Sequence, residues 1–258
     1  MTGPFEEALR EKRALGKKLL VVYVTGGFEN WEASVEAAAA AGADAIEIGI
    51  PFSDPVMDGP VIQQASQIAL DRGTTPLSVL QAAAELDTGI PHAVMTYYNL
   101  AHNPGHERFA ASLVRAGISA AILPDLPYIE SAPWREVAGK AGIETVMLAA
   151  PTTPDHRLGD LCAAAHGFVY AVGLLGVTGE RSALADTATK IAARCKAVTD
   201  KPVLVGVGIG SPEQAVEACA VADGVIIGSA LVRQMLDGHG ASGVGQLVSS
   251  YRAALDEG

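Results

Sequence analysis

Three carboxylates lie close together in the sequence, at the end of an apolar segment and in the loop that follows it. Glu47 interrupts the β-type run Ala45–Ile50, and Asp54 and Asp58 follow in a loop rich in proline and glycine. Burying an unpaired carboxylate costs several kcal/mol or forces the group to take up a proton. A buried Glu beside further carboxylates is therefore typical of general acid/base catalysis. The alternative is an internal salt bridge from Glu47 to a Lys or Arg.

Two glycine-rich segments in the last quarter of the chain predict an anion site. Gly206-Val207-Gly208-Ile209-Gly210-Ser211 ends one apolar run, and Gly228-Ser229-Ala230 ends the next and opens a helix. Glycines let backbone N–H groups approach an oxyanion closely, and a helix N-terminus adds a favourable dipole. The alternative is that these glycines only form tight turns. A third loop, Gly173–Gly179, has the length of a lid over a substrate or of an ordinary connection.

Two tyrosines stand at the ends of other apolar runs. Tyr97 and Tyr170 are expected either to wall an apolar substrate pocket or to pack at its rim. The sequence shows no Ser-centred nucleophile elbow, and no cofactor motif is visible.

The elements that must position these residues alternate regularly along the chain. Eight short runs, most of them apolar on both faces, are separated by helical stretches, as in parallel strands covered by helices. The runs are Leu19–Val24, Ala45–Ile48, Ala93–Thr96, Ala120–Leu123, Thr145–Leu148, Phe168–Val172, Val203–Val207 and Gly224–Ile227. This pattern predicts a (β/α)8 TIM barrel, with an open doubly wound sheet as the alternative. An extra helix over about residues 4–15 is expected before the first strand.

Capping residues mark several of the expected helix starts. Four pairs place a side chain that caps helices before a proline: Thr75-Pro76, Asn103-Pro104, Thr153-Pro154 and Ser211-Pro212. Ser211 with Gln214 reads as a capping box, and Asn30 as the cap of a helix that ends near Gly42.

In a barrel, the alternation of side chains along a strand fixes where Glu47 points. Glu47 shares one face of its run with the small residues Ala45 and Gly49, whereas the other face carries isoleucines. We therefore expect the acid to face the barrel interior near the carboxyl end of its strand, where barrel enzymes carry out their chemistry.

Composition bounds the remaining possibilities. The 258 residues are 49% hydrophobic and contain no linker, so we expect one domain over residues 1–258. A net charge of −11 without a basic stripe argues against a nucleic-acid surface. Neither a signal peptide nor a membrane span is visible. Three widely spaced cysteines, Cys162, Cys195 and Cys219, favour a reducing cytoplasm.

Together, several segments resemble the alpha subunit of tryptophan synthase. The resemblance runs from about Phe5 to Leu231, and the stretch Pro51–Pro60 carries its most specific motif. Further matching segments are Met95–Asn99, Pro124–Pro127, Gly167–Tyr170, Gly176–Gly179, and Asp223-Gly224 through Gly228–Ala230.

The resemblance implies retro-aldol cleavage of indole-3-glycerol phosphate to indole and glyceraldehyde 3-phosphate. Glu47 would be the general acid/base, and Asp58 would accept a hydrogen bond from the indole N–H. We expect burial at an apolar barrel mouth to raise the pKa of Glu47, and a more polar loop setting to keep Asp58 ionised. The resemblance further implies that Gly179, Gly208, Gly228 and Ser229 hold the phosphate, and that Tyr170 and Thr178 help to close the pocket. It implies no metal or organic cofactor for this chain.

The implied partner is a pyridoxal-phosphate-dependent beta subunit in an αββα assembly. The chain departs from the family pattern at Phe28-Glu29, Ala101-His102 and Gly173-Leu174, in loops of the expected active-site face. We therefore keep two alternatives: a stand-alone lyase that releases free indole, and a regulatory alpha-like subunit that mainly activates a beta partner. A different phosphate-binding barrel, such as a Schiff-base aldolase, is disfavoured because it needs a Lys at a strand end.

Overall fold

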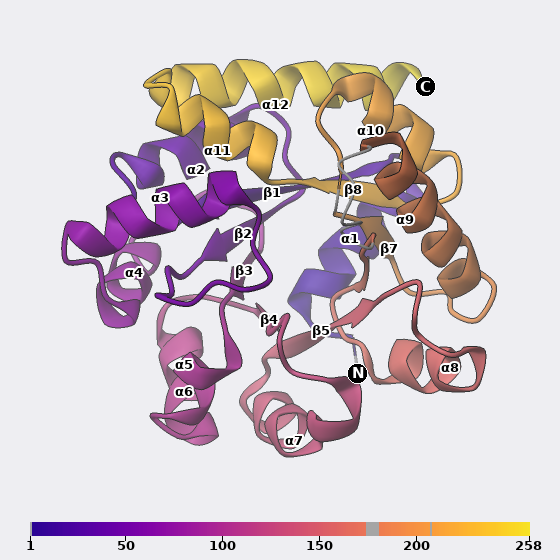
Figure 1. Ribbon diagram of the computed structural model, residues 1–258, viewed down its shortest axis with the longest axis horizontal. Coiled ribbons are helices and arrows are strands. Elements are labelled where there is room, and N and C mark those ends of the chain that lie inside the picture. The colour runs from indigo at the N-terminus through magenta and orange to yellow at the C-terminus, as the bar shows by residue number, and fades with distance from the viewer. Residues whose placement is uncertain (1, 174–180, 207) are drawn as a thin grey trace.

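Eight parallel strands close into a barrel in the order in which they occur along the chain, which confirms the predicted TIM barrel. The computed structural model describes residues 2–173, 181–206 and 208–258. The strands are β1 (Leu19–Thr25), β2 (Ala45–Gly49), β3 (His92–Met95), β4 (Ala120–Ile122), β5 (Glu144–Ala149), β6 (Val169–Ala171), β7 (Val203–Val205) and β8 (Gly224–Ile227). Figure 1 shows these strands as a ring with helices around it.

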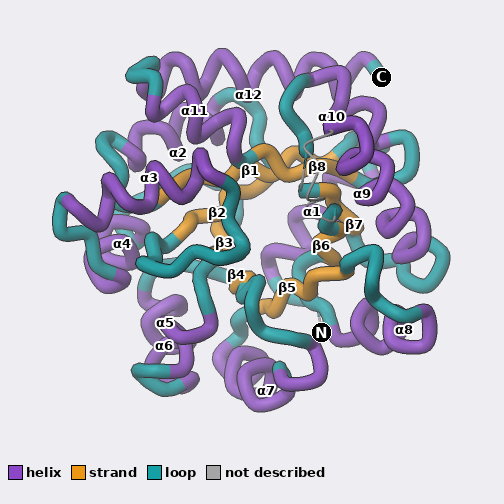
Figure 2. Tube along the Cα trace, viewed as in Figure 1, coloured by secondary structure: helices purple, strands orange, loops and turns teal. Residues whose placement is uncertain are grey.

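Helices follow the strands around the ring (Figure 2). They are α1 (Pro4–Ala14), α2 (Trp31–Ala40), α3 (Pro60–Asp71), α4 (Pro76–Ala83), α5 (Tyr98–His102), α6 (His106–Arg115), the 3-10 helix η1 (Tyr128–Glu130), α7 (Ala132–Ala141), α8 (Asp155–Ala164), α9 (Arg181–Lys196), α10 (Pro212–Cys219), α11 (Ser229–Leu236) and α12 (Gly240–Glu257). In the described part of the chain, none of these helices combines the length and the apolar character needed to cross a membrane.

Two of the predicted helix starts are confirmed. Thr75 caps α4 in a capping box with Ser78, and the Ser211 side chain accepts a hydrogen bond from the Gln214 N–H. Gln214 reaches back to the N–H of Gly210 at 2.7 Å, one residue earlier than a capping box requires.

Two other predicted caps are wrong. α6 begins at His106 after a Gly105 cap, well beyond Asn103. α8 begins after Pro154, and the Thr153 hydroxyl instead accepts a bond from the Ala150 N–H at 3.1 Å. Asn30 does occupy the N-cap position of α2, as predicted, but it adopts a left-handed conformation (φ 54°) and its side chain makes no capping hydrogen bond.

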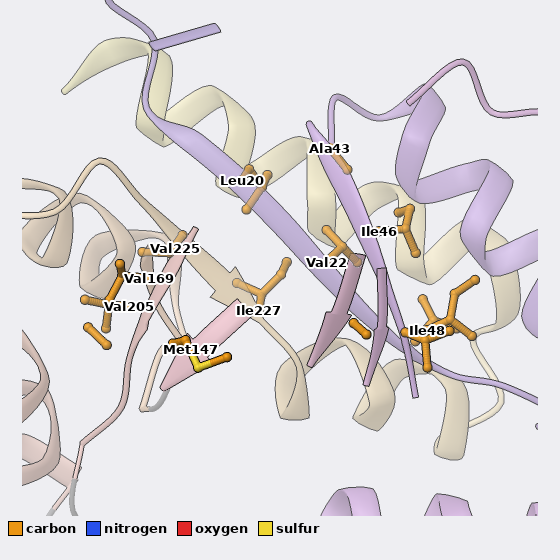
Figure 3. Close-up of a cluster of buried hydrophobic side chains, with 14 of the residues drawn as sticks. Leu20, Val22, Ala43, Ile46, Ile48, Met147, Val169, Val205, Val225 and Ile227 are labelled. Atoms are coloured by element: carbon orange, nitrogen blue, oxygen red, sulfur yellow. The ribbon is translucent and has the colours of Figure 1, made fainter. Parts of the chain in front are cut away.

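The two faces of the strands bury different sets of side chains. Ile46 and Ile48 point outward and pack with Leu20 and Val22 beneath the helices (Figure 3). Ala45 packs inside the barrel with the inward side chains of the other strands. This alternation confirms the predicted orientation of β2, and it places Glu47 on the inward face.

Helix α1 closes the amino end of the barrel, and it lies behind the ring of strands in Figure 1. Phe5 and Leu9 pack against inward side chains of the strands. The buried carboxylate of Glu144, the first residue of β5, accepts hydrogen bonds from the N–H groups of Phe5 (2.7 Å) and Glu6 (2.9 Å). Because this end is plugged, the barrel interior is accessible from the carboxyl ends of the strands, where Glu47 and the following loops lie.

Candidate active site

Glu47 is buried at the mouth of the barrel, and its Oε2 atom has no hydrogen-bond partner among the described residues. Its side chain sits opposite Tyr23 of β1 and Ala93 of β3 in the parallel register, and the residue is 1% exposed. Within the described part of the chain, no hydrogen-bond donor reaches Glu47 Oε2, and no Lys or Arg charge acts on the carboxyl. The alternative of an internal salt bridge is therefore wrong. Burial, with a smaller contribution from the charge of Asp58, raises the pKa of Glu47 to about 8.

Asp58 reaches the site from the loop between β2 and α3. The Tyr97 hydroxyl donates a hydrogen bond to Asp58 Oδ2 at 3.1 Å and accepts one from the Met57 N–H at 2.9 Å. Burial raises the pKa of Asp58 to about 6, and the bond from Tyr97 opposes that rise. The expected polar setting is thus only partly correct: Asp58 is ionised at neutral pH, but by a narrow margin.

Asp54, the third carboxylate of the sequence motif, is not part of this constellation. It is exposed, and its carboxylate accepts a hydrogen bond from the Ser53 hydroxyl at 2.6 Å. Within the described residues, the charge that acts on Glu47 is that of Asp58 and not that of Asp54.

Tyr97 and Tyr170 occupy different positions in the site. Tyr97 is 3% exposed and stacks on Phe52 with ring centroids 5.0 Å apart, so its ring supports the loop that carries Asp58. Tyr170 comes from β6 and packs on the inward face of the barrel. Burial raises the pKa of its hydroxyl, and the charges of Glu47 and Asp58 raise it further. Gly206 leaves room for this ring, since a Cβ there would overlap Tyr170 Cε1.

The predicted anion-binding glycines lie after neighbouring strands. Gly208 follows β7 with a φ of 86°, a conformation that favours glycine. Gly228 precedes α11, and Ser229 is the first residue of that helix. The first N–H groups of α11 have no partner within the helix and carry its positive dipole end. Gly210 is less available, because its N–H already binds Gln214. Thr178 and Gly179 lie outside the described residues.

Apolar side chains surround the carboxylates at the barrel mouth. Met95, Leu148 and Val172 are partly buried and pack on the top of the interior core. An apolar cavity of about 190 Å³ lies beside them, at the carboxyl ends of β4 and β5, and Met57 borders it on the Asp58 side. Neither carboxylate lines this cavity, which meets the site through Met57, the chain neighbour of Asp58, and through Leu148 and Val172.

Two polar side chains of β1 escaped the sequence analysis. Tyr23 and Thr25 share the inward face of β1, opposite Glu47 and Gly49 of β2. The signal was present in the alternation of Val21, Tyr23 and Thr25, which places two hydroxyl groups on the barrel face of an otherwise apolar strand.

Comparison with known proteins identifies the family. A sequence model of the family described as tryptophan synthase alpha chain matches residues 9–250. The chain belongs to the tryptophan synthase alpha chain family. The tryptophan synthase alpha chain of Streptomyces avermitilis is 43% identical over 98% of this chain and 93% of its own length, and that of Thermobifida fusca is 44% identical over 97% and 95%.

Solved structures agree with this assignment. A structure of Mycobacterium tuberculosis tryptophan synthase is 34% identical and has a TM-score of 0.90, with 99% of each chain covered. A subunit alpha of tryptophan synthase from Legionella pneumophila has a TM-score of 0.88 at 31% identity, with 100% of each chain covered. The match to the tryptophan synthase alpha chain family thus covers all eight strands of the barrel, including β2 with Glu47 and the loops that follow β7 and β8.

Proposed function

We propose that this chain catalyses the alpha reaction of tryptophan synthase, the retro-aldol cleavage of indole-3-glycerol phosphate to indole and glyceraldehyde 3-phosphate. Family membership makes the chain an enzyme of tryptophan biosynthesis. The observation that carries the residue assignments is the position of Glu47: a buried carboxyl at the barrel mouth whose Oε2 has no partner among the described residues, close enough to Asp58 for the charge of Asp58 to raise its pKa. A group with this environment is suited to proton transfer near neutral pH.

Glu47 carries both proton transfers in the proposed mechanism. With a pKa of about 8 the carboxyl is protonated at pH 7 and gives its proton to C3 of the indole ring. The resulting carboxylate then takes the proton of the adjacent side-chain hydroxyl. As the C–C bond breaks, its electron pair returns to the ring and the hydroxyl-bearing carbon becomes the aldehyde. Glu47 is thereby restored to its protonated form.

Asp58 and the glycine loops hold the substrate in this proposal. The ionised Asp58 accepts a hydrogen bond from the indole N–H and stabilises the positive charge that the ring gains when C3 is protonated. Gly208, Gly228 and Ser229 bind the phosphate at the dipole end of α11, where an anion is favoured. We assign Gly179 to the same phosphate site, and Tyr170 and Thr178 to closing the pocket around the ring.

A Schiff-base aldolase is not supported by the positions of the lysines. The lysines that precede strands, such as Lys18 and Lys201, lie at the amino end of the barrel, and Lys140, Lys190 and Lys196 lie on helices. Throughout the described residues, no lysine stands at the carboxyl end of a strand, where an imine with a bound substrate would form.

The partner proposed for this chain is a pyridoxal-phosphate-dependent beta subunit in an αββα assembly. Exposed apolar side chains support a docking surface on the active-site face. Val56 in the β2–α3 loop is 79% exposed, and Ile129 in the β4–α7 segment is 65% exposed. Met57 and Tyr128, their chain neighbours, border the same cavity, so the two segments lie close together. Exposed apolar side chains gathered in one region are typical of a protein interface.

We also place the chain in the cytoplasm. All three cysteines, Cys162, Cys195 and Cys219, are buried and free. The thiols of Cys162 and Cys195 interact with one another. Adjacent thiols that stay reduced are typical of a reducing compartment.

An assay for indole tests the proposed function. Purified chain mixed with indole-3-glycerol phosphate is expected to release indole, and no release with or without a beta subunit would contradict the proposal. Titration with a beta subunit separates the alternatives, because a large rise in the cleavage rate would count against a stand-alone lyase. Activity that appears only in the beta subunit's own reaction would favour a regulatory role.

Changing Tyr97 to Phe is expected to lower kcat/KM for indole release about tenfold at pH 6–7. The variant keeps the stack on Phe52 but removes the donor to Asp58, so the pKa of Asp58 rises and less of it is ionised. The acid limb of the pH–rate profile should move to higher pH. Tyr98→Phe is the matched control, because the Tyr98 hydroxyl contacts His106 instead. An unchanged acid limb in Tyr97→Phe would remove Tyr97 from this role.

A further inference from the structure

Two polar atoms inside the barrel mouth lack hydrogen-bond partners. Thr25 Oγ1 and Glu47 Oε2 are both fully buried, and within the described part of the chain no donor or acceptor bonds to either atom. An unsatisfied buried polar group costs about 1–3 kcal/mol. Such groups are rare in folded proteins, and each one needs an explanation. Two of them on the inward faces of neighbouring strands point to a function that Glu47 and Thr25 share.

The register of β1 and β2 brings a second hydroxyl to the same place. Tyr23 pairs with Glu47 and Thr25 with Gly49. Adjacent strands lie about 4.8 Å apart, so these four residues form a small inward-facing quadrilateral. The hydroxyl of Tyr23 fills the space that Gly49 leaves open, because a Cβ on Gly49 would overlap that oxygen. Tyr23 therefore places its hydroxyl above Gly49, on the face that carries Glu47.

Packing holds the Tyr23 ring in this position. The ring is 4% exposed and clusters with Ala65 of α3 and Val232 of α11. Its Cβ also lies 3.5 Å from where a Cβ of Gly228 would stand, so the same ring reaches the proposed phosphate site. The Thr25 hydroxyl lies close enough to that of Tyr23 to lower its pKa as a hydrogen-bonding neighbour does, although within the described residues no contact of Thr25 Oγ1 has the geometry of a formed hydrogen bond.

The reaction creates a need for hydrogen-bond donors beside Glu47. When Glu47 gives its proton to the substrate, its carboxylate is ionised in a buried site where, within the described residues, no donor bonds to Oε2 at rest. The titratable groups that face it are Asp58, Tyr23 and Tyr170. Asp58 repels the new charge, whereas a neutral hydroxyl can donate to it. Thr25 and Tyr23 lie on the strand that neighbours Glu47, and their hydroxyl hydrogens are free to rotate.

We propose that Tyr23 and Thr25 are positioning residues whose hydroxyl groups donate hydrogen bonds to Glu47 in its ionised form. The two hydroxyls stabilise the carboxylate that appears midway through each turnover and hold it ready to accept the second proton. This inference rests on the proposed function of Glu47, and it explains why a buried threonine hydroxyl has no partner in the resting site.

Changing Tyr23 to Phe and Thr25 to Val tests the proposal through the titration of Glu47. Losing a donor to the charged form raises a pKa, so the alkaline limb of kcat/KM should move up by about one unit in the double variant. The value of kcat at pH 7 should fall several-fold, because the carboxylate intermediate is less stable. The single variant Thr25→Ser keeps a hydroxyl at this position, so the alkaline limb of its kcat/KM profile should stay at the wild-type pH.

A matched control distinguishes a local effect from a change in packing. Thr145 also has a buried hydroxyl without a described partner, but it lies on the outward face of β5, so Thr145→Val should leave the profile unchanged. An equal shift in Thr145→Val, or no shift in Tyr23→Phe and Thr25→Val, would overturn the proposal. Carbon-13 NMR of the Glu47 carboxyl measures the same pKa without turnover. It therefore decides this inference even if the wild-type chain releases no indole and the proposed function fails.

Discussion

Replacing Glu47 with Gln is expected to reduce the kcat of indole release by about 10³-fold or more. Glutamine keeps the shape of the side chain but can neither give a proton to C3 nor take one from the hydroxyl, and a positioned acid/base contributes about 10²–10⁴-fold for each transfer. Substrate affinity should change little, because the phosphate is bound at the other side of the mouth. Steady-state kinetics at pH 7 measure both quantities. A loss of less than tenfold would exclude Glu47 from the proton transfers.

The same substitution is expected to stabilise the fold at alkaline pH. Glu47 has a pKa of about 8 in the folded protein, against 4.5 as its ordinary value. Between these values the folded state keeps a proton that the unfolded chain has released, so the free energy of unfolding falls as the pH rises through this window. The glutamine amide never ionises, so the Glu47→Gln variant avoids this loss. Its advantage over the wild type should grow by a few kcal/mol between pH 4.5 and pH 8.

Urea unfolding at pH 5 and pH 8.5 measures that difference. Glu36→Gln is the control, because Glu36 is an exposed residue of α2 and the loss of its carboxylate should not change the pH dependence. A Glu47→Gln variant whose stability relative to the wild type is the same at pH 5 and at pH 8.5 would contradict the raised pKa, and with it the argument that Glu47 begins the reaction protonated.

Replacing Asp58 with Asn is the second change with a large expected effect. We expect kcat/KM to fall about 10²-fold or more, because the amide cannot neutralise the positive charge on the protonated ring. In the wild type, kcat/KM should rise through about pH 6 as Asp58 ionises and fall above about pH 8 as Glu47 loses its proton. Because the groups interact, these values belong to the pair.

The pH profile of Asp58→Asn tests this coupling. The acid limb should disappear, and the alkaline limb should move to lower pH because the charge of Asp58 no longer raises the pKa of Glu47. Asp54→Asn is the control in the same loop, and it should keep both limbs, since Asp54 is exposed and bonded to Ser53. An alkaline limb that stays in place in Asp58→Asn would show that the two carboxylates do not interact.

Periodicity predicted the barrel because each strand carries its signal locally. The inward direction of Glu47 follows from the alternation of Ala45, Glu47 and Gly49 within five residues, and the barrel then fixes which end it occupies. The cap at Thr75 was equally local, since its partner Ser78 lies three residues away. Asn30 precedes α2 as predicted, but its left-handed conformation, which the neighbouring residues do not indicate, comes without a side-chain capping bond.

The parts of the site that sequence missed depend on distant residues. The hydrogen bond from Tyr97 to Asp58 joins residues 39 apart in the chain. The hydroxyls of Tyr23 and Thr25 reach the site only through the register between β1 and β2. The pKa of Asp58 is raised chiefly by burial, which depends on segments that are distant in the sequence. The polar residues of its own loop therefore predicted a more solvated carboxylate than the structure contains.

A crystal structure of the Glu47→Gln variant with uncleaved indole-3-glycerol phosphate tests the central claim most directly. The account predicts the phosphate at Gly208, Gly228 and Ser229, and indole C3 within about 3–3.5 Å of the substituted side chain at position 47. The indole N–H should donate to Asp58. A substrate bound outside the barrel mouth, or one whose C3 lies far from residue 47 while the phosphate occupies another loop, would contradict the account.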